Sequence, residues 1–432
     1  MKLLIAGAMA VMALAAFSLA QTGVDAQAPG PTAGEQLATG LLSPRGMKVG
    51  PDGFIYVAEA GNGGSTTVTV DGADHLIGVS GRISKIDPVT GERTTVADGL
   101  PSDFSPATMD SVGPADVAFL GGNLYYLQTH GGDAYGSPDT PTGVYLVNDD
   151  GSTELVADIG QFNFDNPVAD ILPGGGQADI EPGGNPYAMA VRDGAFYVTD
   201  GNQNQLMRAD LDGTVTRVAE FSGHPVTTGL AAQASGPIYV TNLGAFPFAP
   251  EDGTIYRVGI PSGNTTQFAS GYSSMTDVEF GPAGLLYALT FGDQAAAAGG
   301  PPWDPFTGKL IRVSEDGTLV PVVDGFTFTT AVVFAGDTAY VANNGLSVPG
   351  VFEGEIWKIE GVSLLSGIDT PAPEPTSAPV ATATVPTGPI TAPDTGFGPD
   401  GSDGTPWGVL VLALAGAGIA ATAGAGALRR RG

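Results

Sequence analysis

A short pattern recurs along this chain: an apolar residue, a tyrosine and a second apolar residue, placed just after a turn that contains glycine or aspartate. The copies are centred on Tyr56, Tyr125, Tyr197, Tyr239, Tyr287 and Tyr340. A second alternating segment follows each copy, from GRISKID at residue 81 to GEIWKIE at residue 354. Because alternation with a period of two residues is typical of β-strands, the chain is predicted to be all-β.

Six such units, each with four strands, predict a six-bladed β-propeller. A single blade buries little of its apolar surface, so blades gain stability by stacking around a ring. A long array of β-sandwiches is the weaker alternative. A seventh blade also stays open, since residues 66–70 and 158–186 are long insertions. We interpret both insertions as loops.

The segment EQLATGL, residues 35–41, looks like the end of a repeat that has no beginning. The first copy ends in a fourth strand, ERTTVADGL, whereas the sixth copy stops after GEIWKIEG and lacks one. EQLATGL resembles ERTTVADGL in its pattern and its closing Gly-Leu. We therefore predict that Glu35–Leu41 is the outer strand of the sixth blade and that pairing of the two chain ends closes the ring. The propeller then occupies residues 35–361.

The two ends of the chain predict export and anchoring. Residues 1–26 contain one lysine, an apolar run and then small residues, the pattern of a signal peptide. Residues 366–406 are rich in Pro, Thr, Ser and Ala and should form an extended stalk. Residues 407–428 are uncharged and long enough for a transmembrane helix, and the arginines within 429–432 should stay cytoplasmic. The propeller would then lie on the extracellular face of the cell membrane.

A sorting-like motif, Pro393-Asp394-Thr395-Gly396, precedes the apolar segment. It resembles the sortase signal Leu-Pro-x-Thr-Gly, except that Ala392 stands in place of the leading leucine. If the motif is processed, the chain is cut between Thr395 and Gly396 and joined to the cell wall. If it is not, the tail is a retained membrane anchor. Both alternatives place the protein at the cell surface.

Composition excludes several classes of function. The chain carries 16 Lys and Arg against 45 Asp and Glu, a net charge of −29, and such a field repels the phosphates of nucleic acid. There is no cysteine, which excludes a thiol nucleophile, a Cys-ligated metal and a disulfide framework. The partner is expected to be a small molecule or a surface partner, with the membrane contacted only through the C-terminal helix.

The repeats resemble those of the ScyD/ScyE family, exported propellers related to NHL-repeat proteins. The resemblance covers about residues 35–361. The matching segments are 43–46 (SPRG), 50–61 (GPDGFIYVAEAG), 113–119 (GPADVAF), 185–187 (NPY), 200–202 (DGN) and 206–210 (LMRAD). More distantly, the chain resembles the gluconolactonase-like six-bladed hydrolases. The first resemblance implies an exported propeller and no particular chemistry, and the second implies a metal-dependent hydrolase or lactonase.

Strand direction predicts where a site lies. The start of each first strand and the end of each second strand share one face of the ring, near its central channel. Long loops such as 61–80, 129–142 and 291–307 emerge on this face, and His224 and Asn185 lie in its loops. The ligand-binding candidates at this mouth are Glu59, Asp116, His130, Tyr187, Asp200, Asn242, Asp277 and Asn343.

Four of these candidates suit a hard cation. Glu59, Asp116, Asp200 and Asp277 are carboxylates, and calcium takes six to eight oxygen ligands. Calcium is thus the expected cofactor if there is one, and the alternative is an ordinary polar channel. His75 is placed in a loop and expected to be solvated. Trp303 is expected in an exposed loop, either packing over it or contacting a ligand.

Three functions remain open. The chain can be a surface-displayed binding module, a calcium-dependent hydrolase or lactonase that works through the four carboxylates, or a structural envelope protein. No catalytic motif such as the Gly-x-Ser-x-Gly elbow is present. The binding module therefore leads, and an enzymatic role is the less favoured one.

Overall fold

The computed structural model describes residues 30–70, 72–106, 108, 110–168, 181–244, 249–294, 303–346 and 353–367. The predicted signal peptide, sorting-like motif, transmembrane helix and tail lie outside these residues, as does the predicted stalk from residue 368 onward. In the described ranges no helix combines the length and apolarity that crossing a membrane requires.

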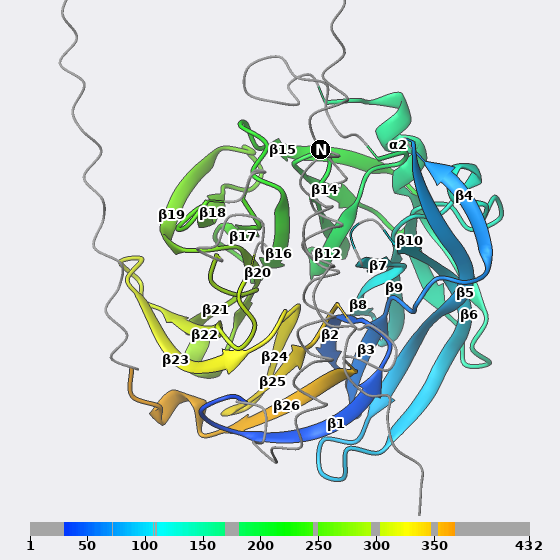
Figure 1. The fold of residues 1–432 in the computed structure, drawn as a ribbon. Coiled ribbons are helices and arrows are strands. Elements are labelled where there is room, and N and C mark those ends of the chain that lie inside the picture. The colour runs from blue at the N-terminus through cyan, green and yellow to red at the C-terminus, as the bar shows by residue number, and fades with distance from the viewer. Residues whose placement is uncertain are drawn as a thin grey trace, which may run out of the picture. The chain divides into compact units, whose positions relative to one another are not determined.

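The described strands form six sheets around a ring, and Figure 1 shows this arrangement. The inner strands are β2 (Pro44–Val49), β8 (Pro114–Leu120), β12 (Pro186–Arg192), β16 (Thr227–Ala231), β20 (Met275–Phe280) and β24 (Ala331–Ala335). Each inner strand contacts the next, and β24 contacts β2. The ring is therefore closed, and the predicted six-bladed β-propeller is confirmed over the described residues.

The second strands carry the tyrosine motif. They are β3 (Ile55–Glu59), β9 (Asn123–Gln128), β13 (Ala195–Asp200), β17 (Ile238–Asn242), β21 (Leu286–Thr290) and β25 (Thr338–Asn343). Each motif tyrosine belongs to a different apolar cluster. Tyr125, for example, packs on Phe196 of the next blade, with ring centroids 4.8 Å apart. The repeat is thus visible in the sequence because each copy supplies one joint between blades.

The outer half of each blade follows the same order. The third strands are β5 (Ala73–Ile86), β10 (Gly143–Val147), β14 (Gln205–Ala209), β18 (Gly253–Val258), β22 (Gly308–Val313) and β26 (Gly354–Glu360). The fourth strands are β6 (Arg93–Ser105), β11 (Thr153–Asp158), β15 (Val215–Glu220), β19 (Thr265–Tyr272), β23 (Leu319–Phe326) and β1 (Glu35–Leu41).

The sixth blade is closed by the N-terminal strand, as predicted. β1 pairs antiparallel with β26, from Glu35 opposite Lys358 to Leu41 opposite Gly354. In Figure 1 the two strands, dark blue and orange, lie side by side. The segment after β26 forms a short 3-10 helix, η3 (Val362–Leu364), and not a strand.

The first blade is larger than predicted. The insertion at residues 66–70 is not a loop but strand β4 (Thr66–Val70), which pairs with the first half of β5. At the other side, β7 (Asp110–Val112) pairs with the end of β6. The described part of the second insertion contains helix α2 (Ile159–Asp165), capped by Asp158. Two further 3-10 turns are η1 (Asp133–Tyr135) and η2 (Pro282–Gly284). β5 therefore extends past the blade at its start and β6 at its end, and both extensions reach the mouth of the channel.

Candidate functional site

A cavity of about 400 Å³ opens where the first strands begin, and residues from all six blades line it. This is the face predicted from strand direction. Asp116, His130, Tyr187 and Asp277 line the cavity, as do Asn185 and His224. Apolar walls come from side chains such as Val226, Leu243, Phe291, Trp303 and Leu346. The cavity therefore offers both charged and apolar contacts to a small ligand.

The other candidates are turned into the blades and do not line this cavity. Glu59 is fully buried, and its carboxylate accepts hydrogen bonds from the Leu42 backbone at 2.6 Å and from Arg82 at 2.9 Å. Asp200 accepts from the backbone of Asn185 and of Gln203, both at 2.9 Å. Each carboxylate fastens the segment before a first strand to the end of the neighbouring second strand.

Asn242 and Asn343 also satisfy buried backbone groups with their side chains. The Asn242 side chain accepts from the Thr254 backbone at 2.6 Å, and the Asn343 side chain accepts from the Thr327 backbone at 2.7 Å. Among the described residues, the predicted calcium set of Glu59, Asp116, Asp200 and Asp277 is not brought together. Second-strand ends need polar side chains because the backbone N–H groups beside them are buried.

Asp116 and Asp277 occupy equivalent places near the start of β8 and β20. Asp116 accepts from the Met189 backbone at 2.7 Å, and Asp277 accepts from the Val332 backbone at 2.8 Å. Each bond reaches the next blade. A glycine of the preceding blade leaves the room, since a Cβ atom on Gly46 would lie 1.9 Å from the Asp116 carboxylate. Burial raises the pKa of Asp116 to about 7, against the opposing field of Lys48, and raises that of Asp277 well above its usual range.

An ion pair crosses the channel below this level. Lys48 of β2 is paired with Glu279 of β20, and these strands are not neighbours in the ring. Both side chains also line a second cavity of about 260 Å³, among residues from the far ends of the first strands. Burial alone would lower the pKa of Lys48, but the negative charge of Glu279 opposes this effect and the pKa is raised. The pair thus lies between the two cavities.

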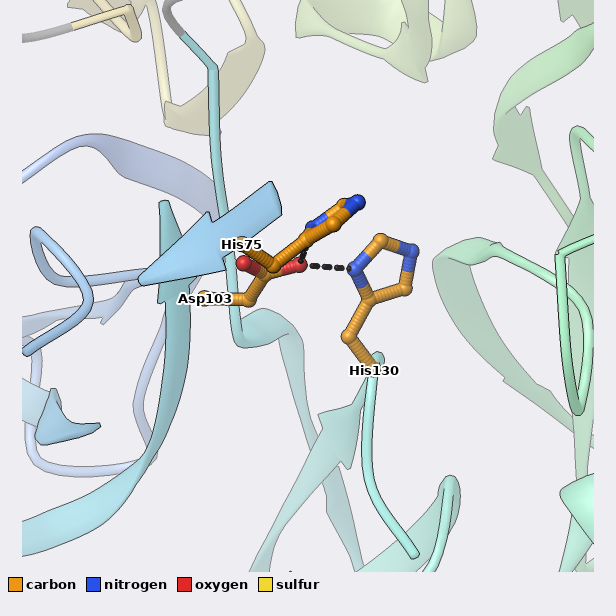
Figure 2. Close-up of side chains that lie close together, drawn as sticks. All are labelled: His75, Asp103 and His130. Carbon is orange, nitrogen blue, oxygen red and sulfur yellow. Dashed lines mark hydrogen bonds and ion pairs between the residues drawn. The ribbon is translucent and has the colours of Figure 1, made fainter. Parts of the chain in front are cut away.

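Two histidines converge on one carboxylate in the wall of the large cavity (Figure 2). The Nδ1 atoms of His75 and His130 lie 2.7 Å and 2.8 Å from the same oxygen, Oδ2 of Asp103. His75 comes from β5, Asp103 from β6 and His130 from the segment after β9. The expectation of a solvated His75 is wrong, because its side chain is only 12% exposed.

The environment of His130 favours a charged imidazole. Burial alone would lower its pKa, but hydrogen bonds with Asp103 and Glu181 outweigh burial and raise the pKa to about 9. Glu181 lies 3.4 Å from Nε2 of His130, and the ring of Tyr135 stacks on the imidazole at 4.2 Å. Burial alone would raise the pKa of Asp103, but the hydrogen bonds with the two histidines outweigh burial and lower it. At neutral pH this cluster therefore carries charges of both signs in the cavity wall.

Sequence reasoning missed Asp103 and misplaced His75 for an identifiable reason. Asp103 follows Gly99-Leu100, which matches the Gly40-Leu41 that ends the outer strand of the sixth blade, so Asp103 seemed to lie beyond its own blade. The alternation of TTVTV at residues 66–70 was the available signal, since a strand there must pair with a neighbour. That partner is the half of β5 that contains His75.

Trp303 is buried, so the expectation of an exposed loop residue is wrong. Its ring packs against Phe291, with centroids 4.9 Å apart, and its indole N–H donates to the Ser274 hydroxyl at 2.8 Å. One face of this packed cluster borders the large cavity.

One protein family model matches part of the chain. Residues 184–344 match the family model described as "SMP-30/Gluconolactonase/LRE-like region". This range covers the blades β12–β15, β16–β19 and β20–β23, together with β24 and β25. The likeness to this family model is thus limited to three blades and part of a fourth. The comparisons do not single out the ScyD/ScyE family.

Several solved structures are similar to this ring at low identity. Virginiamycin B lyase from Staphylococcus aureus is 12% identical over 76% of this chain and 98% of its own, with a TM-score of 0.41. A putative gluconolactonase is 13% identical over 80% and 95%, at 0.45, and a luciferin-regenerating enzyme 12% over 78% and 98%, at 0.48. No curated protein matches the chain in sequence.

Proposed function

We propose that this propeller is an exported binding module of the ScyD/ScyE type, which holds a small organic ligand in the large cavity. The cavity itself carries the proposal: about 400 Å³, bordered by all six blades. Clefts of this size with mostly apolar walls and a few convergent polar groups are typical of ligand sites. Here the polar groups include His130 and Tyr187, and the apolar ones include Phe291 and Leu346.

The test is a ligand screen with the full chain. Compounds that bind should raise the melting temperature, since a ligand that binds only the folded state stabilises it. Filling the cavity through Ala115→Phe should weaken binding of any such compound at least tenfold. Ala335→Phe is the matched control, because Ala335 is an exposed residue at the opposite end of a first strand. Equal binding by both variants would place the ligand elsewhere.

A second candidate function is hydrolysis of a lactone or ester, which the charged His130 favours. A fixed imidazolium can stabilise negative charge that develops on a carbonyl oxygen. A panel of lactones and esters tests this with His130→Gln against His224→Ala, the second variant also altering the cavity wall. Turnover that survives His130→Gln, or no turnover at all, would contradict it.

We also propose that the protein is exported and held at the cell surface, on the basis of the signal-peptide pattern and the apolar C-terminal segment. We expect the signal peptide to be removed and the propeller to face the outside of the cell, tethered by the C-terminal segment. Protease added to intact cells should release the propeller, and mass spectrometry of the mature C-terminus should show whether it ends at Thr395. Recovery of the propeller in the cytosolic fraction would refute this location.

A further inference from the structure

Two of the three histidines of this chain meet at one buried carboxylate, although they lie far apart in the sequence. We propose that His75, Asp103 and His130 form a site for one divalent transition-metal ion, with Zn²⁺ as the reference. The ligands are the Nδ1 atoms of both histidines and the carboxylate of Asp103. This site lies in the cavity wall and differs in residues and in metal class from the calcium set expected from sequence.

The ligand atoms of His75, Asp103 and His130 lie close enough together to share one ion. One ligand atom from each of the three residues lies within 4.8 Å of the others, and within the described ranges no other such set of three occurs. In tetrahedral zinc sites, bonds of about 2.0–2.1 Å place ligand atoms about 3.3 Å apart. The present contacts of 2.7 Å and 2.8 Å need to open by roughly half an ångström for an ion to enter. The ion would replace the protons that now lie between the imidazole nitrogens and the carboxylate, and these protons would pass to solvent.

One oxygen of the buried Asp103 carboxylate lacks a hydrogen-bond partner within the described part of the chain. Asp103 is 1% exposed, and its Oδ1 atom has no hydrogen-bond partner within the described part of the chain. A buried carboxylate oxygen without a partner is costly, so an arrangement that leaves one calls for an explanation. A cation between the imidazoles and the carboxylate would compensate that charge.

The two ring nitrogens of His130 face different partners. Nδ1 faces Asp103, and Nε2 faces Glu181 at 3.4 Å. Metal-binding histidines commonly direct their second ring nitrogen to a carboxylate, which fixes the tautomer and leaves the first nitrogen for the ion. The stacked ring of Tyr135 holds the imidazole plane. Glu181 and Tyr135 would thus position the ligand without touching the metal.

The ligand set selects the class of ion. Imidazole nitrogens suit Zn²⁺, Co²⁺, Ni²⁺ and Cu²⁺, whereas Ca²⁺ and Mg²⁺ prefer oxygen ligands. Three protein ligands leave a fourth position open in a tetrahedral site. All three residues line the large cavity, so that position would face it. A bound ligand or a water molecule can therefore complete the coordination.

Metal binding to the full chain, first stripped with a chelator, tests the site directly. Co²⁺ should bind with a stoichiometry of one and give visible absorption bands typical of nitrogen and oxygen ligands in tetrahedral geometry, and Zn²⁺ should displace it. His75→Ala, Asp103→Asn and His130→Ala should each weaken Co²⁺ binding by about 100-fold or more, since removing a ligand costs at least as much as removing its outer partner. His224→Ala should bind as the parent does.

The control is sharp because His224 is the third histidine of the chain and lines the same cavity, yet lies outside the cluster. Equal Co²⁺ affinity in His75→Ala and the parent, or saturable binding of Ca²⁺ but not Co²⁺, would overturn the site. If His130→Ala does not fold, His75→Ala decides, because His75 is at the partly exposed edge of the cluster. The readout uses no organic ligand, so the metal site and the ligand proposal fail separately.

Discussion

Buried acids in this ring differ by what surrounds them, and their burial alone does not reveal their role. Glu59 is met by two arginines, with Arg93 at 3.5 Å in addition to Arg82. Asp116 meets backbone N–H groups, and Asp103 meets imidazoles. These surroundings separate structural carboxylates from one that can bind a ligand or a metal.

The structural role of Glu59 leads to a stability prediction. Glu59→Ala should lower the free energy of unfolding by about 3–5 kcal/mol, because it leaves Arg82 and the Leu42 N–H without their buried acceptor. Denaturant unfolding measures the loss. Co²⁺ binding should not change, since Glu59 does not belong to the histidine cluster. A stability equal to that of the parent would mean that the joint between blades does not depend on this carboxylate.

Asp116 predicts a pH dependence. Its pKa is about 7 in the folded chain against 3.8 for an ordinary aspartate, so the folded state binds the extra proton between these values. Stability due to this group therefore falls as pH rises from about 4 to about 7, by on the order of 4 kcal/mol. Asp116→Asn does not titrate, so its stability relative to the parent should improve over that range. Parallel unfolding curves at pH 4.5, 6 and 8 check this, and a constant difference would refute it.

How far the site could be read from sequence depends on whether its residues share the repeat. Asp116 and Asp277 recur at one position of a first strand, so their place at the channel mouth was predictable. Asp103 and His75 lie in extensions that only one blade has, and no repeated neighbour marks them. Glu59 and Asp200 were placed on the correct face, but the sequence could not show that backbone N–H groups there turn their side chains inward.

At the scale of elements, most of the ring could be predicted because every blade repeats the same buried strand. The closing strand was predictable for a different reason: the sixth unit lacked a fourth strand, and a fragment of one stood at the other end. β4 was missed, although its Thr and Val alternate as in a strand, because nothing in the other blades corresponds to it. Features shared among blades were visible in the sequence, and additions to a single blade were not.

The closing strand can be tested by deletion. Removing Glu35–Leu41 should cost at least about 3 kcal/mol, since burying Leu41 alone is worth roughly that amount. It would also expose the edge of β26, which invites pairing with other chains. Melting and size-exclusion measurements check both effects. A deletion variant that melts like the parent and stays monomeric would show that the ring closes without β1.

At the scale of the whole molecule, the net charge of −29 predicts a dependence on salt. Self-repulsion destabilises a compact state, and salt screens it. Raising NaCl from about 0.01 M to 0.5 M should therefore raise the melting temperature by a few degrees, with a chelator present throughout so that bound cations do not contribute. A fall in melting temperature would show instead that surface ion pairs dominate.

The ion pair of Lys48 and Glu279 affects how a solute can move through the central channel of the ring. A β-propeller has a channel along its axis, and here the Lys48–Glu279 pair lies across that channel between two cavities. The ring therefore resembles a cup more than an open tube. While the two side chains stay paired, a solute that enters the large cavity would leave by the same opening. Entry and exit of a solute then use the same opening, so a solute already bound delays the entry of the next one.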